Sequence, residues 1–365
     1  MDLQQLFKYL VESKSPTPED GHILDFITSY LDKFEAIRID VNGVKNLFLY
    51  KKFADGIHLS FAGHVDVVPA GDGWDSDPYK LVEKDGYLYG RGTQDMKSGV
   101  ASMVKALNEV EYFNGTLSLM LTSDEEGDGF YGTQEILKYL EKENFLPDMC
   151  LVTEPTCEEQ MGDAIKVGRR GSINGVLEII GKQGHAAYPE KSVNPVNLLA
   201  PRLNQLAGYF LDNGDEYFSP SQLVITDIRG GMEVTNVTPN NVKLMFNVRN
   251  NTLTTKDDIQ NYIEKVCNGI DYNLNFQPIV SVPFYTSTNS SLVKTLDVSI
   301  KKVCGITPKY STAGGTSDAR FISKYGIDVI EFGVINDRIH AQNERTTKKE
   351  VEDLKNVIST LIKEL

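Results

Sequence analysis

Three apolar segments that each end in metal-binding residue types constrain the fold of this chain most. The segments, with the residues that end them, are 59–68 (His64, Asp66), 115–129 (Glu125, Glu126) and 148–156 (Glu154). Segments with helical periodicity lie between them, and such alternation predicts a parallel sheet with crossover helices. Because these sheets bind ligands beyond the carboxyl ends of their strands, we expect the three endings to converge on one site.

Each of these endings has a simpler explanation when it is taken alone. A single histidine near a strand end is usually a satisfied polar residue, and an acidic run is usually a solvated loop. Asp95 lies in a glycine-flanked loop, GRGTQDMKSG, just before a predicted helix, where an aspartate commonly caps the helix. His64 and Asp66, at i and i+2 of a strand, share one face, as a metal-binding imidazole and its orienting carboxylate do.

Size and charge limit the classes of function. At 365 residues the chain is long enough for two domains, and its net charge of −14 argues against nucleic acid or an anionic membrane as a partner. The first residues show no signal-peptide pattern, and no apolar run approaches the ~18 residues of a membrane span. Four scattered cysteines without CxxC spacing indicate reduced thiols, so we expect a cytoplasmic protein.

The pattern of predicted elements changes at about residue 172. The large domain is predicted over 1–171 and 285–365, as a mixed, mostly parallel sheet flanked by helices. Its N-terminal part is expected to be helical, with a second helix starting at Thr17-Pro18. A small α+β domain of ferredoxin-like type is predicted over 172–284. The helices expected there are 194–211 and 255–268, and its last strand is expected over 272–280.

Six separated motifs occur in one order along the chain. They are HVDVVP, GRGTQDMKSG, SDEEG, TEP, GHAAYP and IHAQNE. Together they resemble the motifs of the dinuclear zinc aminoacylase/peptidase superfamily, which has a zinc-exopeptidase-like fold, and the resemblance runs over essentially the whole chain. Within this superfamily, GRRGS, GHAAYP and AGGTSDARF resemble the succinyl-diaminopimelate desuccinylase branch.

The resemblance implies a metal centre and a set of catalytic residues. His64, Asp95 and Glu154 would bind one zinc, and Asp95, Glu126 and His340 the other, with Asp95 shared; Co²⁺ or Mn²⁺ are possible substitutes. Glu125 would be the general base, and Asp66 would orient His64. The inserted domain would serve as a lid and form a homodimer, in which His185 reaches the active site of the partner subunit and stabilises the oxyanion.

The implied reaction is hydrolysis of N-succinyl-LL-2,6-diaminoheptanedioate to succinate and LL-2,6-diaminoheptanedioate, a step of lysine and diaminopimelate biosynthesis. The candidates for holding the substrate carboxylates are Arg169, Asn236, Arg249, Gly315, Thr316 and Asn336. Arg249 could equally be an outward-facing strand residue, and the glycine pair before Thr316 could be a tight turn.

Three other functions stay open at this point. The chain could be another deacylase or dipeptidase of the superfamily, such as an acetylornithine deacetylase. It could also be a non-catalytic binding protein that kept the fold, although every matched position is intact. A structural zinc module is the third possibility, but such sites are usually closed and rich in cysteine.

Overall fold

The computed structural model describes residues 1–278 and 281–365. The chain forms two compact units. The first unit comprises Met1–Gly168, Thr286–Ser311 and Ser317–Leu365, and the second comprises Arg169–Tyr285 and Thr312–Thr316. The predicted insertion, 172–284, falls within the second unit, which also takes in a short segment of the later chain.

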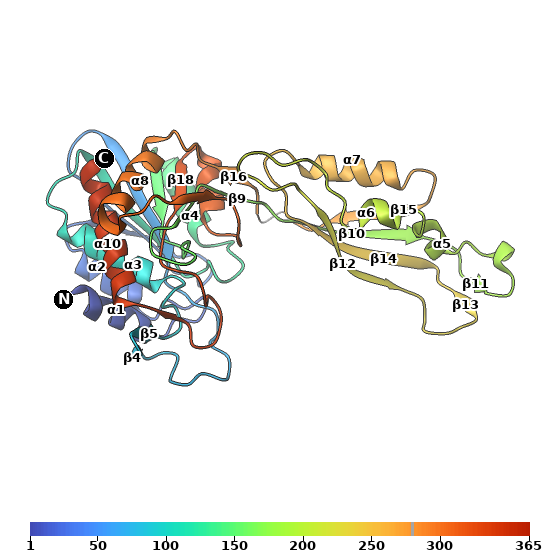
Figure 1. The fold of residues 1–365 in the computed structure, drawn as a ribbon, viewed down its shortest axis with the longest axis horizontal. Helices are drawn as coiled ribbons and strands as arrows, with labels where there is room; N and C mark the ends of the chain where they lie inside the picture. The colour runs from blue at the N-terminus through green and yellow to red at the C-terminus, as the bar shows by residue number, and fades with distance from the viewer. Residues whose placement is uncertain (279–280) are drawn as a thin grey trace. The chain divides into compact units, whose positions relative to one another are not determined.

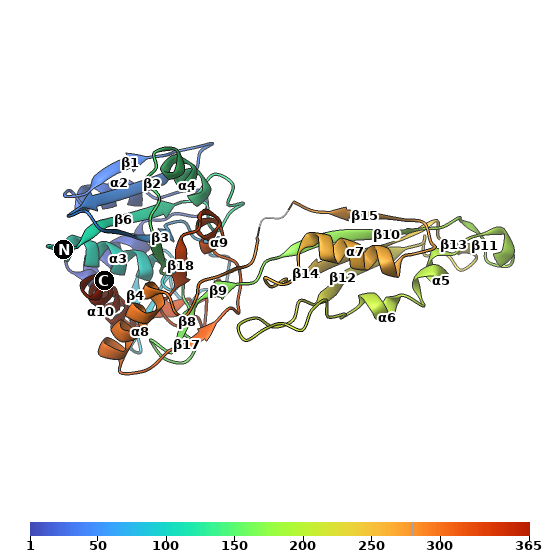
Figure 2. The same cartoon turned by 90° about the horizontal axis from the view of Figure 1, so that it is seen from above.

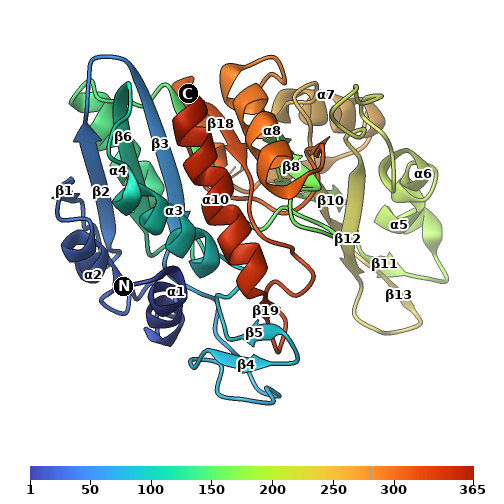
Figure 3. The ribbon, with the colours of Figure 1, turned by 60° about the vertical axis from the view of Figure 1, so that its left-hand side comes forward.

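An eight-stranded sheet forms the centre of the first unit (Figure 3). In spatial order its strands are β1 (Glu35–Arg38), β2 (Asn46–Lys52), β6 (Gly115–Thr122), β3 (Ile57–His64), β7 (Met149–Val152), β18 (Asp328–Glu331), β8 (Ala164–Lys166) and β17 (Lys309–Ser311). The four central strands β6, β3, β7 and β18 are parallel. On one side β2 runs antiparallel to both β6 and β1, and on the other side β8 runs antiparallel to β18. The predicted mixed, mostly parallel sheet is therefore confirmed.

The register of the central strands brings their carboxyl ends to one edge of the sheet. His64, the last residue of β3, pairs with Thr122, the last residue of β6, and Ala62 pairs with Val152 at the end of β7. These strands are apolar and buried because helices pack against the sheet, as expected for a parallel sheet. Side chains that follow these strands consequently start from the same edge.

Helices and small sheets complete the first unit. Its helices are α1 (Leu3–Glu12), α2 (Ile23–Tyr30), α3 (Lys97–Glu109), α4 (Thr133–Lys142), α8 (Ser291–Cys304), α9 (Ala319–Ile322), η2 (Ser323–Tyr325) and α10 (Lys348–Glu364). Helix α3 packs against α1 and α10, and α10 packs against α8, while α4 packs against α9. A three-stranded sheet contains β19 (Arg345–Thr346), β5 (Tyr87–Tyr89) and β4 (Val82–Lys84).

The predicted helix start at Thr17 is wrong, because α2 begins at Ile23. The backbone around Thr17 is engaged elsewhere: the Thr17 N–H donates to the carbonyl of Val67, whose own N–H donates to Ser15. The segment therefore pairs with the chain that follows β3. The cap-like composition of Thr17-Pro18 is overridden by this long-range pairing.

The second unit is built on a four-stranded antiparallel sheet (Figures 1 and 2). Its strands in spatial order are β12 (Leu223–Gly230), β14 (Asn241–Val248), β10 (Ile173–Ile180) and β15 (Tyr272–Phe276). The remaining elements with residues in this unit are β9 (Gly168–Arg169), β11 (Gly184–His185), η1 (Pro189–Lys191), α5 (Pro195–Leu199), α6 (Leu203–Leu206), β13 (Val237–Thr238), α7 (Lys256–Val266) and β16 (Phe284–Tyr285).

The main elements follow the order β–α–β–β–α–β, with the first strand between the third and the fourth, which confirms the ferredoxin-like prediction. Helix α7 begins at a capping box on Thr255, as its sequence predicts. The helix expected over 194–211 is instead two short helices, α5 and α6. The last strand ends at Phe276, and residues 279–280 of its predicted range lie outside the described residues.

None of the helices in residues 1–278 and 281–365 has the length and apolar character needed to span a bilayer.

Candidate metal centre

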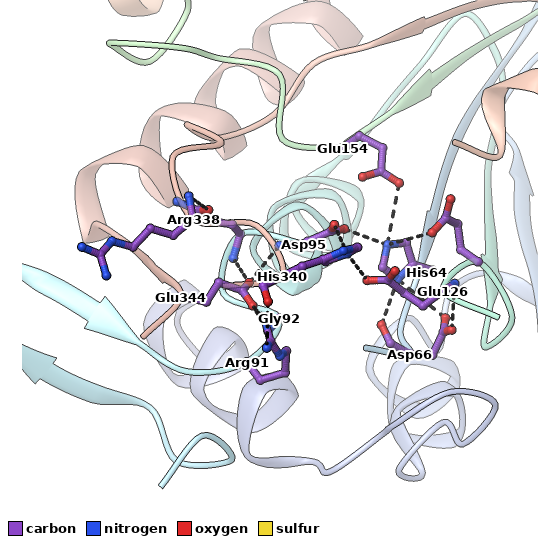
Figure 4. A network of polar contacts seen from close by, with 12 residues as sticks. His64, Asp66, Arg91, Gly92, Asp95, Glu126, Glu154, Arg338, His340 and Glu344 are labelled. Carbon is purple, nitrogen blue, oxygen red and sulfur yellow. Dashed lines mark hydrogen bonds and ion pairs between the residues drawn. The ribbon is translucent and has the colours of Figure 1, made fainter. Parts of the chain in front are cut away.

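Each central strand of the first unit is followed by a residue that faces a common centre (Figure 4). His64 ends β3, Glu126 follows β6 by four residues, and Glu154 follows β7 by two. His340 lies in the loop after β18, and Asp95 lies in the loop that enters α3. The structure thus brings together all five residues that the motifs nominate as metal ligands.

Asp95 stands between the two histidines. Its Oδ1 lies 3.0 Å from Nε2 of His64, and its Oδ2 lies 3.2 Å from Nε2 of His340. A carboxylate that offers each oxygen to a different imidazole has the arrangement of a ligand that bridges two metal ions. Asp95 does not cap α3, because the cap residue is Met96 and no side chain accepts a hydrogen bond there.

One further carboxylate accompanies each histidine. Oε1 of Glu154 is 3.7 Å from Nε2 of His64, and Oε1 of Glu126 is 3.0 Å from Nε2 of His340. Two ligands of a tetrahedral zinc, with bonds of about 2.0–2.1 Å, are about 3.3 Å apart. Separations of 3.0–3.7 Å are of this size, so each histidine has two carboxylates at distances that ligands of one metal ion can have.

Glu125 also approaches His64, with Oε2 at 3.9 Å from Nε2, so a group of His64, Glu125 and Glu154 could hold an ion as well. His64, Asp95 and Glu126 form another such group. His64 cannot serve two ions, since its Nδ1 donates to the carbonyl of Asp66 at 2.9 Å and leaves only Nε2. Asp95, with its two oxygens, can face both positions, and the separate roles of Asp95 and Glu125 stay predictions.

The charges around the centre favour a cation. Burial and nearby carboxylates raise the pKa of Glu125 and of Glu154 well above the usual range. Hydrogen bonds to Asp95 and Glu126 raise the pKa of His340 to about 10. Burial would raise the pKa of Asp95, but hydrogen bonds from the two histidines hold it well below its usual range. These raised pKa values reflect buried carboxylates crowded around the centre, whose repulsion a bound cation would relieve.

Asp66 contacts His64 in a different way from the one expected. The imidazole Nδ1 lies 2.9 Å from the main-chain carbonyl of Asp66 and 3.6 Å from its carboxylate. The carboxylate instead accepts the N–H of Glu126 at 3.2 Å, and burial raises its pKa to about 6. Asp66 thus contacts two of the nominated ligands, one through its backbone and one through its side chain.

Five of the predicted residues lie in the second unit in two groups. The N–H of Ala186 donates to the carbonyl of Asn236, so His185, on β11, and Asn236, directly before the paired strand β13, are neighbours. Arg169 is buried and donates to the carbonyls of Ala313 and Gly315. Gly315 and Thr316 are exposed.

Two further candidates stand apart from these groups. Arg249 is exposed at the end of β14. Asn336, in the first unit, is half-buried, and its N–H donates to the carbonyl of Cys157. The roles of all these residues in substrate binding stay predictions.

Two buried residues next to the centre were not predicted from the sequence. Glu344 and Arg91 are 0% and 2% exposed and form an ion pair with 2.7 Å between Oε2 and Nη1. Both lie within the quoted motifs IHAQNE and GRGTQDMKSG. Both residues belong to motifs that resemble those of the superfamily, and this could have marked them as candidates. No local sequence pattern indicates that they pair with each other.

Comparison with known proteins agrees with this geometry. Residues 60–364 match the model of peptidase family M20/M25/M40. The chain belongs to this family. It is therefore a metal-dependent hydrolase, as the site residues indicate. The matched range includes residues of both units, so the family model also covers the inserted domain.

Two curated relatives cover nearly the full chain. The chain is 65% identical over 358 residues to a succinyl-diaminopimelate desuccinylase of Sulfurimonas denitrificans, with 98% of each chain covered. It is 58% identical over 363 residues to a succinyl-diaminopimelate desuccinylase of Nitratiruptor sp., with 100% of both covered. The fold is also that of aminopeptidase PepT from Bacillus cereus, with a TM-score of 0.82, 22% identity and coverage of 99% and 97%.

Proposed function

We propose that the protein hydrolyses N-succinyl-LL-2,6-diaminoheptanedioate to succinate and LL-2,6-diaminoheptanedioate, using two zinc ions. The observation that carries the hydrolytic part is the position of Asp95 between His64 and His340, with one further carboxylate beside each histidine. The choice of substrate is supported by the curated relatives, which are named for this activity. A structural neighbour from Bacillus subtilis is described as a dinuclear metal-binding peptidase.

The chain's own residues would divide the work of amide hydrolysis. His64, Asp95 and Glu154 would hold one ion, and His340, Asp95 and Glu126 the other. Two bound divalent ions supply Lewis acidity, which polarises a carbonyl and lowers the pKa of water towards neutrality. The main-chain carbonyl of Asp66 fixes the ring of His64 so that Nε2 faces the centre.

Glu125 is the proposed proton carrier. It adjoins Glu126 in sequence, yet its carboxylate lies 3.9 Å from His64 and has no metal position of its own in our assignment. Its pKa is raised by burial and by nearby carboxylates, which suits a group that must both accept and return a proton. Glu125 would take a proton from the attacking water and deliver it to the leaving amine.

The second unit would bind the substrate and form the homodimer. The open face of its sheet exposes the apolar side chains of Val224 and Met245, and β12 is an edge strand, so a second copy of this chain could pair there. His185 of the partner subunit would stabilise the oxyanion. Arg169, Asn236, Arg249, Gly315, Thr316 and Asn336 are the proposed contacts for the substrate carboxylates.

A reducing compartment suits the protein, since Cys150, Cys157 and Cys267 are buried free thiols, and we propose that it acts in the cytoplasm. Zinc is the proposed native metal, although a centre of carboxylates and imidazoles also accepts Co²⁺ or Mn²⁺.

The test is release of free amine by metal-stripped protein, with and without two equivalents of Zn²⁺. N-succinyl-LL-2,6-diaminoheptanedioate and N-acetylornithine would be offered in parallel. We expect zinc-dependent cleavage of the succinyl compound alone. Cleavage of the acetyl compound instead would keep the centre and change the substrate, whereas cleavage of neither, with two zinc ions bound, would contradict the proposed reaction.

A further inference from the structure

The carboxylate of Glu344 is surrounded by hydrogen-bond donors from the loop that carries Asp95 (Figure 4). Its Oε1 accepts the N–H groups of Gln94 at 2.7 Å and Asp95 at 3.1 Å. Its Oε2 accepts the N–H of Gly92 at 3.0 Å and Nη1 of Arg91 at 2.7 Å. One buried side chain thereby fixes the backbone of the shared ligand and of the two residues that lead to it.

Arg91 extends this network to the loop that carries His340. Its Nη2 lies 3.3 Å from the carbonyl of His340 and 3.3 Å from that of Ala70. The ring of Trp74, the single tryptophan of the chain, lies 5.1 Å from the guanidinium carbon. The positive charge of Arg91 is thus covered by an aromatic ring and paired with Glu344, an arrangement that makes its burial tolerable.

Gln94 adds a second connection between the same two loops. Its side-chain N–H donates to the carboxylate of Asp337, and its side-chain oxygen Oε1 accepts the N–H of Arg338 at 2.9 Å. The N–H of Gly90 also donates to the main-chain carbonyl of Glu344 at 3.1 Å. Residues 90–95 and 337–344 are therefore joined both before and after His340, and through the residues that lead to Asp95.

The two joined loops carry two of the nominated ligands that lie outside helices and strands, Asp95 and His340. His64 ends a strand, and Glu154 follows one by two residues. Asp95 and His340 lie in loops, and His340 has a φ of 60°, in the left-handed region that histidine seldom adopts. Without further contacts, ordering these loops would have to occur on metal binding, at a cost in conformational entropy.

We infer that Glu344 and Arg91 are positioning residues, which join the loops of Asp95 and His340 and set the metal position that depends on both. The inference rests on the proposed metal centre. The position held by His340, Asp95 and Glu126 takes two of its three ligands from the joined loops, whereas the position of His64, Asp95 and Glu154 takes one. Loss of the Glu344–Arg91 pair therefore weakens one metal equivalent more than the other.

The test is calorimetric titration of metal-stripped protein with Zn²⁺, without substrate, for the wild type and for Glu344→Gln. Glutamine keeps the shape of the side chain, but its NH₂ group replaces one carboxylate oxygen. It would then face N–H donors that it cannot accept a hydrogen bond from. We expect one of the two equivalents to bind about 10- to 100-fold more weakly, in the range seen when outer partners of metal ligands are lost. The other equivalent should change less.

The matched control is Glu83→Gln, which makes the same chemical change in the exposed ion pair between Glu83 and Lys348. It should bind both equivalents like the wild type. Trp74 supplies an independent signal, because its fluorescence reports on the surroundings of Arg91; the emission should change in Glu344→Gln and stay constant in Glu83→Gln.

Arg91→Lys covers the case in which Glu344→Gln does not fold. Lysine keeps a charge beside Glu344 but loses the planar fork that also reaches the carbonyl of His340. A smaller weakening of the same equivalent is expected. Two equivalents with wild-type affinities in folded Glu344→Gln or Arg91→Lys would overturn the inference. Failure of the wild type to bind two ions would instead overturn the metal centre itself, and with it the inference.

Discussion

At the scale of single residues, the adjacent glutamates Glu125 and Glu126 have different surroundings. Oε1 of Glu126 lies 3.0 Å from His340, and its N–H is held by Asp66. Glu125 points towards His64 at 3.9 Å, and its side chain is 12% exposed, so it faces the centre without being enclosed by ligands. Consecutive residues in an irregular loop can point in different directions, so the proposed metal ligand Glu126 and the proposed proton carrier Glu125 can be neighbours in sequence.

Glu125→Gln is expected to keep both metal ions and to lose at least 10²-fold in turnover, the lower end of the contribution of a general base. Glutamine has nearly the same shape but cannot accept a proton. Metal content by atomic absorption and the rate of amine release are the measurements. Glu143→Gln, an exposed glutamate beyond α4, should leave both unchanged. Near-normal turnover of Glu125→Gln would mean that another group moves the proton.

His58 makes a separate prediction about stability. It is buried on β3, with Nε2 2.8 Å from Oγ of Ser118, and burial lowers its pKa from the ordinary 6.5 to about 4. The folded state thus favours neutral His58. The unfolding free energy therefore has its full value, as far as His58 is concerned, above pH 6.5, and it falls as the pH falls from 6.5 towards 4. The difference corresponds to roughly 3 kcal/mol of unfolding free energy.

His58→Gln should therefore make the unfolding free energy of metal-stripped protein flatter between pH 6.5 and pH 4. Urea unfolding at several pH values measures this slope. His22→Asn serves as the control, because His22 is exposed and asparagine tolerates its φ of 61°. An identical slope in His58→Gln and the wild type would show that His58 is not kept neutral by the fold.

At the scale of elements, the sequence predicts the helices and strands that have a regular apolar pattern. The apolar strands and the residues that end them follow from periodicity, and so the sequence alone suffices to place His64, Glu126 and Glu154 at one sheet edge. Asp95 could not be placed in this way, because its local pattern equally fits a helix cap. Its position depends on Glu344, a residue almost 250 positions later whose hydrogen bonds no local pattern encodes.

Thr17 illustrates the opposite error, in which a clear local pattern is overridden. Its composition predicts a helix start, but its backbone pairs with Val67, which lies beyond β3. Tertiary contacts of this kind decide the position of element boundaries more than propensity does. The division of 194–211 into α5 and α6 is a further boundary that periodicity alone did not reveal.

Gly99 shows how the packing of α3 fixes the centre. A Cβ atom there would lie 2.3 Å from Oγ1 and 2.5 Å from the carbonyl of Thr153, the residue before Glu154. Helix α3 begins two residues after Asp95, so Gly99 lets the helix that follows one ligand approach the loop that bears another. Any side chain at this position would have to push the two apart.

Gly99→Ala is accordingly expected to cost about 1–3 kcal/mol of unfolding free energy, the usual range for overpacking, and to weaken zinc binding. Alanine would be favoured over glycine in an unconstrained helix, so the sign of the change is diagnostic. Ser98→Ala, at the preceding buried position, should have little effect because the Ser98 hydroxyl has no hydrogen-bond partner. Stabilisation by Gly99→Ala would show that the helix can shift without disturbing the centre.

At the scale of the whole molecule, the two units have unequal shares of the proposed chemistry. The first unit contains every nominated metal ligand together with Glu125, while the second contains His185 and most of the proposed substrate contacts. The chemistry of the first unit follows from its own geometry. In the proposed homodimer, what the second unit contributes depends on assembly, which local sequence patterns do not encode.

Mixing two inactive variants tests whether His185 acts on the partner subunit. Glu125→Gln and His185→Ala should each be inactive as homodimers. In a mixed dimer, one site combines Glu125 of one chain with His185 of the other, so it is complete if His185 acts across the dimer. Random exchange makes half of the dimers mixed, each with one working site, and should restore about a quarter of wild-type turnover.

Two different affinity tags, purified in succession, isolate the mixed dimers and measure their activity directly. Such dimers would work at about half of the wild-type rate per dimer if His185 acts in trans, because only one of two sites is complete. If His185 acts within its own chain, each site lacks one of the two groups and the mixed dimer stays inactive. Failure to isolate any mixed dimer after unfolding and refolding the variants together would contradict the homodimer itself.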